Sequence, residues 1–283
     1  MAAQQGIKRR IKSVSNTRQI TKAMQLVAAS KLRKAQDAAL GPKEYIEASK
    51  DLLATLATTP EARYHSLFNS RKVKNALSII ISSDRGLAGA YNSNISRQHL
   101  QHAHELKVPH KVICIGRYAA LHVARNKNLN EISAYDLDHG DADIALAQPI
   151  LTEAIELFEN NEVDIVTITY TKFVSTIRQE VVTEQLLPLA IPEGKMVAGR
   201  TFEPESEQLL DLSIKRLLEA IVLQAVLESR ASEHAARMLA MKNATDNASD
   251  LIEDLTLEFN NARQASITQE LAEITAGAEA ING

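Results

Sequence analysis

The last quarter of the chain keeps one hydrophobic pattern over an unusual length. From Glu205 to Ala276 there is neither glycine nor proline, and apolar side chains recur at heptad spacing. At about 1.5 Å per residue, a helix of this length is roughly 108 Å long. Polar residues such as Ser213, Gln224 and His234 interrupt the apolar positions. Because a polar, small-residue seam pairs helices closely but weakly, the pattern predicts one long helix with a weakly paired coiled-coil face.

A second helical pattern opens the chain. Ile7–Leu40 also lacks glycine and proline, Gly41-Pro42 permits a bend, and the pattern resumes over Glu44–Thr59. Two long helices at opposite ends of one sequence predict an antiparallel coiled coil with a compact domain between them. Because the first helix is the shorter, we expect the turns around Ile267–Ala280 to stand alone beyond the pair.

The middle of the chain alternates between two periodicities. Short runs rich in β-branched residues predict strands at Ala76–Ser82, Lys111–Ile115 and Val163–Tyr170, with a further candidate at Glu184–Ile191. Helical patterns lie between them at Asn94–Leu106, Tyr118–Asn126 and Ile144–Asn160. Alternating strands and helices indicate a Rossmann-like α/β domain with mostly parallel strands.

The predicted organisation therefore has three parts. They are an N-terminal coiled-coil helix (1–59), a central α/β domain (73–191) and a C-terminal coiled-coil helix (205–283). The fold class is α/β plus long helices.

Charge is distributed unevenly along the chain, although its net value is only −3. Every charged residue before Asp37 is basic, whereas from Asp250 onwards Arg263 is the one base among acids. Two solvated faces that attract each other are one interpretation, nucleic-acid binding is a second, and an acidic protein partner is a third. Aromatic residues make up only 4% and tryptophan is missing, which argues against the stacking platforms of single-strand binders.

The chain offers little chemistry of its own. The loop Ser83–Ala90 follows a strand, as phosphate loops do, but lacks their glycine spacing, so we interpret it as a structural turn. For His99, His102 and His104 we prefer a solvated helix face to a metal site, and for the aspartates of Asp136–Asp143 a polar loop and helix cap to a calcium site. We predict no catalytic residue, no cofactor and no metal.

The single cysteine and the hydropathy limit the class of protein further. Cys114 lies in an apolar run, so a buried core thiol is expected, and one cysteine excludes an internal disulfide. No run approaches the ~18 apolar residues of a membrane span, and the N-terminus lacks the apolar core of a secretory signal. The basic start could imitate a mitochondrial presequence, but the helical pattern runs on from Ile7. We expect a cytosolic protein, or one peripheral to a membrane complex.

Several segments together resemble the gamma subunit of the rotary ATP synthase. They occur in the expected order at Ile20–Met24, Val27–Lys34, Ser83–Leu87, Ala235–Met238, Met241–Asn247 and Ala262–Glu270, with a terminal signature running on to Ala278.

This resemblance implies a central rotor stalk that couples proton-driven rotation to ATP synthesis and regulates ATPase activity and proton flow. The implied partners are a threefold ring of alpha and beta subunits, the epsilon subunit and the membrane c-ring, with no nucleic acid. Nucleotide would bind to alpha and beta, so this chain would be a non-catalytic subunit. It would lie on the cytoplasmic side of a bacterial inner membrane, attached only through the complex.

The resemblance also implies partner-contact residues. Basic residues Lys22, Lys31, Arg33 and Lys34 would face acidic loops of the beta subunits, with Met24 beside them. Arg237, Gln264 and Thr268 would form a polar catch with the ring, next to Gln269 and Glu270 in the terminal signature. Phe202 and Glu203 would lie near epsilon and the c-ring.

Two other classes of protein remain open from the residues alone. A freestanding coiled-coil spacer or adaptor would self-associate through its seam. An α/β enzyme using the Asp84–Gly89 loop would bind nucleotide by itself.

Overall fold

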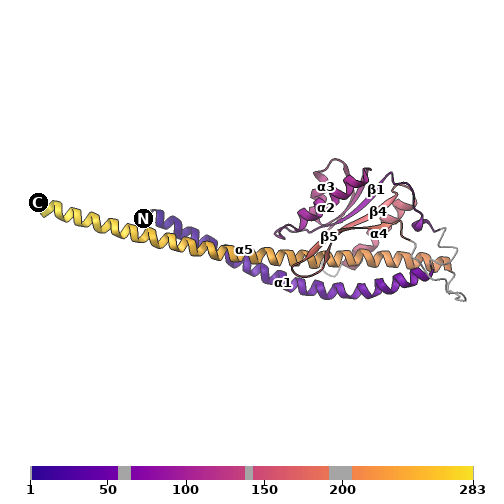
Figure 1. The fold of residues 1–283 in the computed structure, drawn as a ribbon, viewed down its shortest axis with the longest axis horizontal. Helices are drawn as coiled ribbons and strands as arrows, with labels where there is room; N and C mark the ends of the chain where they lie inside the picture. The colour runs from indigo at the N-terminus through magenta and orange to yellow at the C-terminus, as the bar shows by residue number, and fades with distance from the viewer. Residues whose placement is uncertain (1, 57–64, 138–142, 191–205, 283) are drawn as a thin grey trace. The chain divides into compact units, whose positions relative to one another are not determined.

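The computed structural model describes residues 2–56, 65–137, 143–190 and 206–282. The chain divides into two compact units, one formed by residues 1–28 with 238–283 and the other by residues 29–237. Helices α1 (Ala2–Leu56) and α5 (Ser206–Asn282) each contribute to both units (Figure 1). The bend expected at Gly41-Pro42 does not end α1, because Pro42 lies inside the helix.

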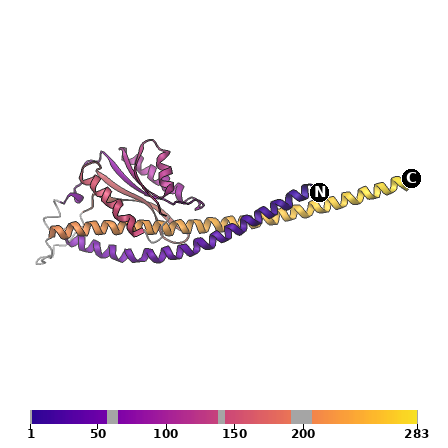
Figure 2. The ribbon, with the colours of Figure 1, turned by 180° about the vertical axis from the view of Figure 1, so that it is seen from behind.

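In the first unit, the two ends of the chain pair as antiparallel helices. Thr245 Oγ1 donates a hydrogen bond to Thr21 Oγ1 at 2.8 Å, and Gln4 Nε2 donates one to the carbonyl oxygen of Ala262 at 3.2 Å. Residue numbers along α1 therefore decrease as those along α5 increase, which makes the two helices antiparallel. The two terminal segments lie side by side (Figures 1 and 2). The antiparallel coiled coil predicted from the two breaker-free ends is confirmed.

The oppositely charged ends of α1 and α5 do not hold this pair together. Among the described residues, no ion pair joins the basic start of α1 to the acidic end of α5; the ion pairs found are all in the other unit. The buried side chains of this unit are Thr21, Ala28, Met241, Ala248 and Leu255, and Thr21 is hydrogen-bonded to Thr245. The expected mutual attraction of these faces therefore acts at most over long range.

Beyond Ala262, α5 continues without a helical partner among the described residues. The helix runs through Gly277 to Asn282, and residues 267–276 are exposed. Exposure reaches 48% at Ile267, 60% at Leu271 and 68% at Ile274. The expected unpaired end of the long helix is present over these residues.

The second unit contains a five-stranded sheet in the order β3-β2-β1-β4-β5. β1, β2, β3 and β4 are parallel, and β5 is antiparallel to β4. The strand bounds are Ala76–Ile81 (β1), His110–Ile115 (β2), Leu129–Tyr135 (β3), Ile165–Phe173 (β4) and Gln179–Leu187 (β5). The helices beside the long pair are Ser66–Phe68 (η2, a 3-10 turn), Tyr91–Leu106 (α2), Arg117–Ala124 (α3) and Asp143–Glu159 (α4). The mostly parallel α/β domain is confirmed, with β3 as a strand that the sequence pattern missed.

Alternating residues of the sheet build two cores. Ile79 and Ile81 join a large cluster that includes α4 and the second-unit parts of α1 and α5. Ile80 and Cys114 face the other way and pack against α2 and α3, which cover that face of the sheet in Figure 1. Burial raises the pKa of the Cys114 thiol to about 12, so this thiol is a core side chain, as expected.

Small polar residues attach α5 to the end of β4. The Ser229 hydroxyl accepts a hydrogen bond from the Thr171 amide at 3.3 Å, and the Ser232 hydroxyl donates one to the Thr171 carbonyl at 3.0 Å. Tyr91 of α2 donates to the Ser229 carbonyl at 3.1 Å. Ser229 and Ser232 are buried, so the interruptions of the hydrophobic pattern here are contacts with the sheet.

Candidate functional site

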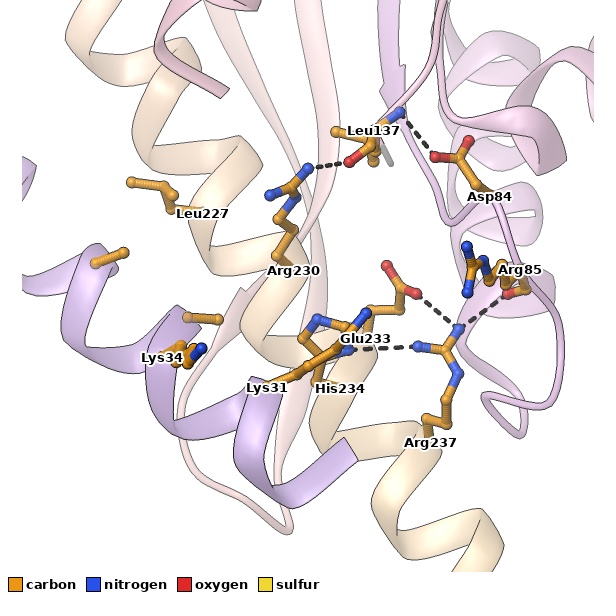
Figure 3. A pocket seen from close by; sticks show the side chains of 12 residues that line it. Lys31, Lys34, Asp84, Arg85, Leu137, Leu227, Arg230, Glu233, His234 and Arg237 are labelled. Carbon is orange, nitrogen blue, oxygen red and sulfur yellow. Dashed lines mark hydrogen bonds and ion pairs between the residues drawn. The ribbon is translucent and has the colours of Figure 1, made fainter. Parts of the chain in front are cut away.

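A basic pocket lies in the second unit between α1, the loop after β1, and α5 (Figure 3). Its volume is about 420 Å³. The charged and titratable residues that line it are Lys31 and Lys34 from α1, Asp84 and Arg85 from the loop, and Arg230, Glu233, His234 and Arg237 from α5.

The α5 side of this pocket follows from helical spacing. Arg230, Glu233, His234 and Arg237 recur at intervals of three and four residues, which places them on one face of a helix. Figure 3 shows Arg237 reaching toward Arg85 of the loop, His234 lying beside Lys31 of α1, and Arg230 reaching toward Leu137.

Arg237 ties this face of α5 to the loop after β1. Its guanidinium lies 2.7 Å from Glu233 Oε1 and donates hydrogen bonds to the carbonyl oxygens of Arg85 at 3.0 Å and Gly86 at 3.3 Å. The Arg237 and Glu233 side chains are only 12% and 11% exposed. Burial raises the pKa of Glu233, and the Arg237 guanidinium limits that rise.

The loop itself is held by its own side chains. Asp84 Oδ1 accepts a hydrogen bond from the Arg117 amide at the start of α3, at 2.9 Å, and Asp84 Oδ2 accepts one from the Leu137 amide at 2.7 Å. A Cβ added at Gly86 would lie 2.7 Å from the Tyr118 hydroxyl oxygen. Ser83–Ala90 therefore acts as a structural turn that joins β1, α3 and the end of β3.

Positive charge dominates the pocket. The pKa of His234 falls to about 4, first because the imidazole is buried and then because Arg237, Lys31 and Arg230 repel its proton. Lys31 and Lys34 are exposed on α1, and neither has an ion pair or hydrogen bond within the described part of the chain. Arg230 donates a hydrogen bond to the Leu137 carbonyl.

The other predicted contacts on α1 are spread along the helix. Lys22 is exposed and donates a hydrogen bond to Gln25 Oε1 at 3.3 Å. Met24 is half-buried, and Arg33 is exposed. Lys22 and Met24 belong to the first unit, whereas Arg33 belongs with the pocket lysines to the second.

The predicted contacts near the end of α5 are all exposed. Thr268 donates to the Gln264 carbonyl at 3.0 Å, one turn earlier. Gln269 donates to Glu273 at 3.0 Å, and Glu270 accepts from Ser266 at 3.4 Å. These bonds all stay within α5, so the side chains present an exposed polar surface.

The structure does not group all the predicted residues. Gln264 and Thr268 share the first unit, but Arg237 lies in the second, engaged with the loop. Phe202 and Glu203 lie outside the described residues, as do Asp138 and Asp141. The role of each as a partner contact stays a prediction.

The histidine segment differs from the expectation of a solvated helix face. His99 is fully buried, with its Nδ1 3.2 Å from His122 Nε2, and His110 is buried beside it. His102 is half-buried, and only His104 is exposed. Over the ranges that the structure describes, no group of three or more His, Cys, Asp or Glu residues is arranged to hold a metal ion.

Sequence reasoning missed Arg230 and Glu233. Their polar side chains recur at helical spacing within an otherwise apolar face of the last helix, and this pattern could have indicated them. What the spacing could not show was that the loop Asp84–Gly86 lies opposite them.

The fold defines a class of protein in which two long terminal helices pair antiparallel and an α/β domain is inserted between them. Within the described residues, no helix combines the length and apolar character needed to cross a bilayer.

Comparison with known proteins narrows this class. A family described as ATP synthase matches residues 3–281. The chain is 41% identical over 281 residues to the ATP synthase gamma chain of Brevibacillus brevis, covering 97% of each, and 38% identical to that of Moorella thermoacetica, covering 99% of this chain and 100% of the relative. This chain belongs to the ATP synthase gamma chain family.

Solved structures agree on the fold. The central stalk of the Tetrahymena thermophila mitochondrial ATP synthase matches with a TM-score of 0.62 at 25% identity, over 80% of this chain and 99% of that one. A chain from the Euglena gracilis mitochondrial ATP synthase matches with a TM-score of 0.70 at 19% identity, over 99% and 95%.

Proposed function

We propose that this chain is the central rotor stalk of an ATP synthase. It couples proton-driven rotation of a membrane c-ring to ATP synthesis on a threefold ring of alpha and beta subunits, and it regulates ATPase activity and proton flow. The observation that supports the stalk role is the membership of this chain in the ATP synthase gamma chain family. The physical support is the pair of long antiparallel helices, which can transmit torque along their length.

The surfaces of the first unit suit a shaft that turns inside a sleeve. Few side chains are buried along its helix pair, and isolated hydrogen bonds such as Thr245–Thr21 join the two helices. The end of α5 exposes Ile267, Leu271 and Ile274. Apolar residues exposed on one element are typical of a surface that meets a partner. Weak individual contacts suit repeated making and breaking, because no single angle then becomes a deep energy minimum.

The chain acts as a non-catalytic subunit in this proposal. Its one phosphate-loop candidate, Ser83–Ala90, uses Asp84 and Gly86 to hold its own fold. Nucleotide therefore binds to alpha and beta. The complex places this chain on the cytoplasmic side of a bacterial inner membrane, with epsilon and the c-ring beside the α/β domain.

The proposed partner contacts fall into two groups. Exposed bases Lys22, Lys31, Arg33 and Lys34, with Met24, face acidic beta-subunit loops, where exposed ion pairs contribute only ~0–1 kcal/mol each. Gln264, Thr268, Gln269 and Glu270 face the ring near the end of α5. Arg237 can join the second group only by releasing its bonds to the loop, and Phe202 and Glu203 are assigned to epsilon and the c-ring by resemblance alone.

The decisive experiment is purification of the tagged chain from membranes in mild detergent, followed by quantitation of its stoichiometric neighbours. We expect one copy per three alpha and three beta subunits, with epsilon and the c-ring. A freestanding adaptor predicts a homodimer, and a nucleotide-binding enzyme predicts the chain alone with bound nucleotide; either result would reject the stalk role.

A second experiment tests the contacts at the end of α5. The double variant Gln264→Ala/Thr268→Ala removes two side-chain hydrogen-bonding groups, each contributing about 0.5–1.5 kcal/mol. If both bonds form only in the rate-limiting state, the loss of about 2 kcal/mol should lower ATP synthesis by the complex about 30-fold. Thr256→Ala is the matched control, because Thr256 makes the same bond to the carbonyl one turn earlier, Ile252, at 2.7 Å. Equal rates for the control and the double variant would remove these residues from the proposed catch.

A further inference from the structure

A group of histidines lies between the sheet and the two helices that cover one of its faces. His99 and His102 come from α2, His122 from α3 and His110 from the start of β2. These four residues are called the histidine cluster. His99, His110 and His122 are buried, at 0%, 4% and 8% exposure, and His102 is half-buried. Three elements of the second unit therefore meet through imidazole rings.

Hydrogen bonds connect the cluster to the elements around it. His99 Nδ1 lies 3.2 Å from His122 Nε2, which joins α2 to α3, and His110 Nδ1 lies 3.2 Å from the buried Ser78 hydroxyl of β1. The bond between His99 and His122 requires one of the two facing nitrogens to carry no hydrogen. If both rings are protonated, this bond between α2 and α3 is lost.

The cluster contains nothing that would compensate an added positive charge. The Nε2 atoms of His99, His102 and His110 are buried and have no hydrogen bond within the described part of the chain. Burial lowers the pKa of His99 to about 3, and the charges that add to this shift come from His122, His110 and His102. Burial also lowers the pKa of His110 and of His122; His102 adds to the shift of His110, and the Ala103 backbone opposes it.

The charged side chains on the surrounding elements do not offset this burial. Among the described residues, no carboxylate contributes to the pKa shifts of His99, His110 or His122. Glu131 lies 3.6 Å from the Cys114 thiol instead, and β1 has no charged residue. The charged residues on the other elements are Arg97 and Glu105 on α2, Arg117 on α3, Lys111 on β2, Glu131 on β3, Lys172 on β4, and Glu180 and Glu184 on β5.

The position of the cluster limits its effect to one face of the sheet. His99 follows Ile95 by one turn of α2, and His122 precedes Val123 on α3; Ile95 and Val123 belong to the smaller of the two cores, which α2 and α3 cover (Figure 1). The larger core, on the other face, is built with α4 and the second-unit parts of α1 and α5. Protonation of the cluster therefore acts on the layer formed by α2 and α3.

We propose that the histidine cluster is an acid-sensitive latch, which holds α2 and α3 on the sheet at neutral pH and releases them when the protein is acidified. The open layer binds protons that the closed layer excludes, so the closed layer is favoured above pH ~6.5 and becomes less favoured as pH falls. For an open-state pKa of about 6.5, His99 alone raises the opening equilibrium constant about 25-fold between pH 7 and pH 5. His110 and His122 add to this factor.

Hydrogen exchange of the purified full-length chain tests the latch, which does not rest on the stalk role. Mass spectrometry gives protection factors for α2, α3 and α4, corrected for the pH dependence of chemical exchange. Between pH 7 and pH 5, α2 and α3 should lose protection at least about 25-fold, and a return to neutral pH should restore it. α4 belongs to the other core and should keep its protection. Equal loss in α4 would mean global unfolding, and either that result or full protection of α2 at pH 5 would overturn the proposal.

Substitutions separate the cluster from the other histidines. His99→Met cannot bind a proton, so the loss of protection in α2 should be smaller by about 25-fold. His104→Met is the matched control, because His104 is exposed on the same helix, and it should behave as the parent does. If His99→Met does not fold, His122→Gln tests the same hydrogen bond nearer the surface and should also reduce the loss. A parent-like pH dependence in the cluster variants would refute the latch.

The single cysteine provides an independent readout. Cys114 is buried in the core that α2 and α3 cover, so a thiol reagent reaches it only when this layer opens. Labelling by dithiodipyridine, which also reacts at acidic pH, is measured relative to the urea-unfolded chain at the same pH. The relative rate should rise at least about 25-fold between pH 7 and pH 5 in the parent, and less in His99→Met. Loss of α2 protection without faster Cys114 labelling would confine the change to α2 and overturn the release of the layer.

Discussion

Replacing Arg237 by glutamine should destabilise the α/β unit in a way that depends on pH. The substitution leaves Glu233, with its side chain 11% exposed, without its ion-pair partner, and it removes the charged hydrogen bonds to the Arg85 and Gly86 carbonyls. Breaking a buried pair from one side costs about 3–5 kcal/mol. The loss of stability has an upper limit here, because the Glu233 carboxyl group, left without Arg237, can bind a proton and become neutral.

The upper limit on this destabilisation is the free energy needed to protonate Glu233 at the pH of the experiment. With an unfolded pKa of about 4.3, protonating Glu233 costs about 3.7 kcal/mol at pH 7 but about 1 kcal/mol at pH 5. Its folded pKa is already raised, and Arg237 limits that rise. The protonation of Glu233 therefore contributes its full share of the free energy of unfolding below the pKa of the unfolded state. That contribution is lost as pH rises through the higher pKa of the folded state. Without Arg237 the loss extends to higher pH, so we expect a destabilisation of about 3 kcal/mol at pH 7 and about 1 kcal/mol at pH 5.

Urea unfolding of the full-length chain, followed by tyrosine fluorescence, measures this difference. The chain has no tryptophan, and buried Tyr91 and Tyr170 report on the α/β unit. The double variant Glu233→Gln/Arg237→Gln should recover about 2 kcal/mol at pH 7 and lose the pH dependence. Arg216→Gln is the control, because its pair with Glu219 is exposed on the arginine side (61%). A loss that is equal at pH 5 and pH 7, or a double variant no more stable than Arg237→Gln, would refute the reasoning.

Two further predictions concern the α/β unit. Gly116→Ala should cost about 2–4 kcal/mol in the same urea assay, because Gly116 has φ +88° and an added Cβ would lie 2.5 Å from the Ser82 carbonyl oxygen; a loss below 1 kcal/mol would show that the loop relaxes. Stability should also fall between pH 7 and pH 5, since burial lowers the pKa of His99 to about 3 and that of His122 in the same direction. Below pH ~6.5 the unfolded state binds a proton at His99, whereas the folded state does not. This difference should lower the free energy of unfolding by about 2 kcal/mol between pH 7 and pH 5. His99→Met should remove that part of the pH dependence and His104→Met, on the exposed side of α2, should not.

The sequence predicted the elements that carry a long, uniform signal. The breaker-free ends became α1 and α5, and Ala76–Ser82 became the central strand β1, because continuous apolar β-branched runs are typical of buried parallel strands. β3 gave no such run: its residues alternate irregularly between half-buried and exposed at the edge of the sheet. An edge strand therefore resembles a loop in its pattern, and only the neighbouring strand β2 reveals it.

The site was harder to predict because its residues act through the tertiary fold. The spacing of Glu233 and Arg237 shows that they share a helix face, but their role comes from the carbonyl oxygens of a loop about 150 residues away in the sequence. For the same reason the pattern could not place His99, which α2 turns into the core against His122. Pro42 is a third case: proline removes one helical hydrogen bond, yet α1 continues because Ile46 and Leu53 beyond it are buried in the core.

Helix α5 changes its partners along its length, and its sequence changes accordingly. Where it meets the sheet, Ser229 and Ser232 are buried and bond to Thr171. Where it meets α1 in the first unit, hydrogen bonds join Thr245 to Thr21 and Gln4 to Ala262, and Met241, Ala248 and Leu255 are buried. Past Ala262, residues 267–276 have no partner within the described part of the chain and still present apolar side chains. A solitary helix gains little stability from its own propensity, and exposed apolar residues do not stabilise it in water. The fold of the chain itself therefore does not explain these apolar side chains, and the surrounding ring proposed above would cover them.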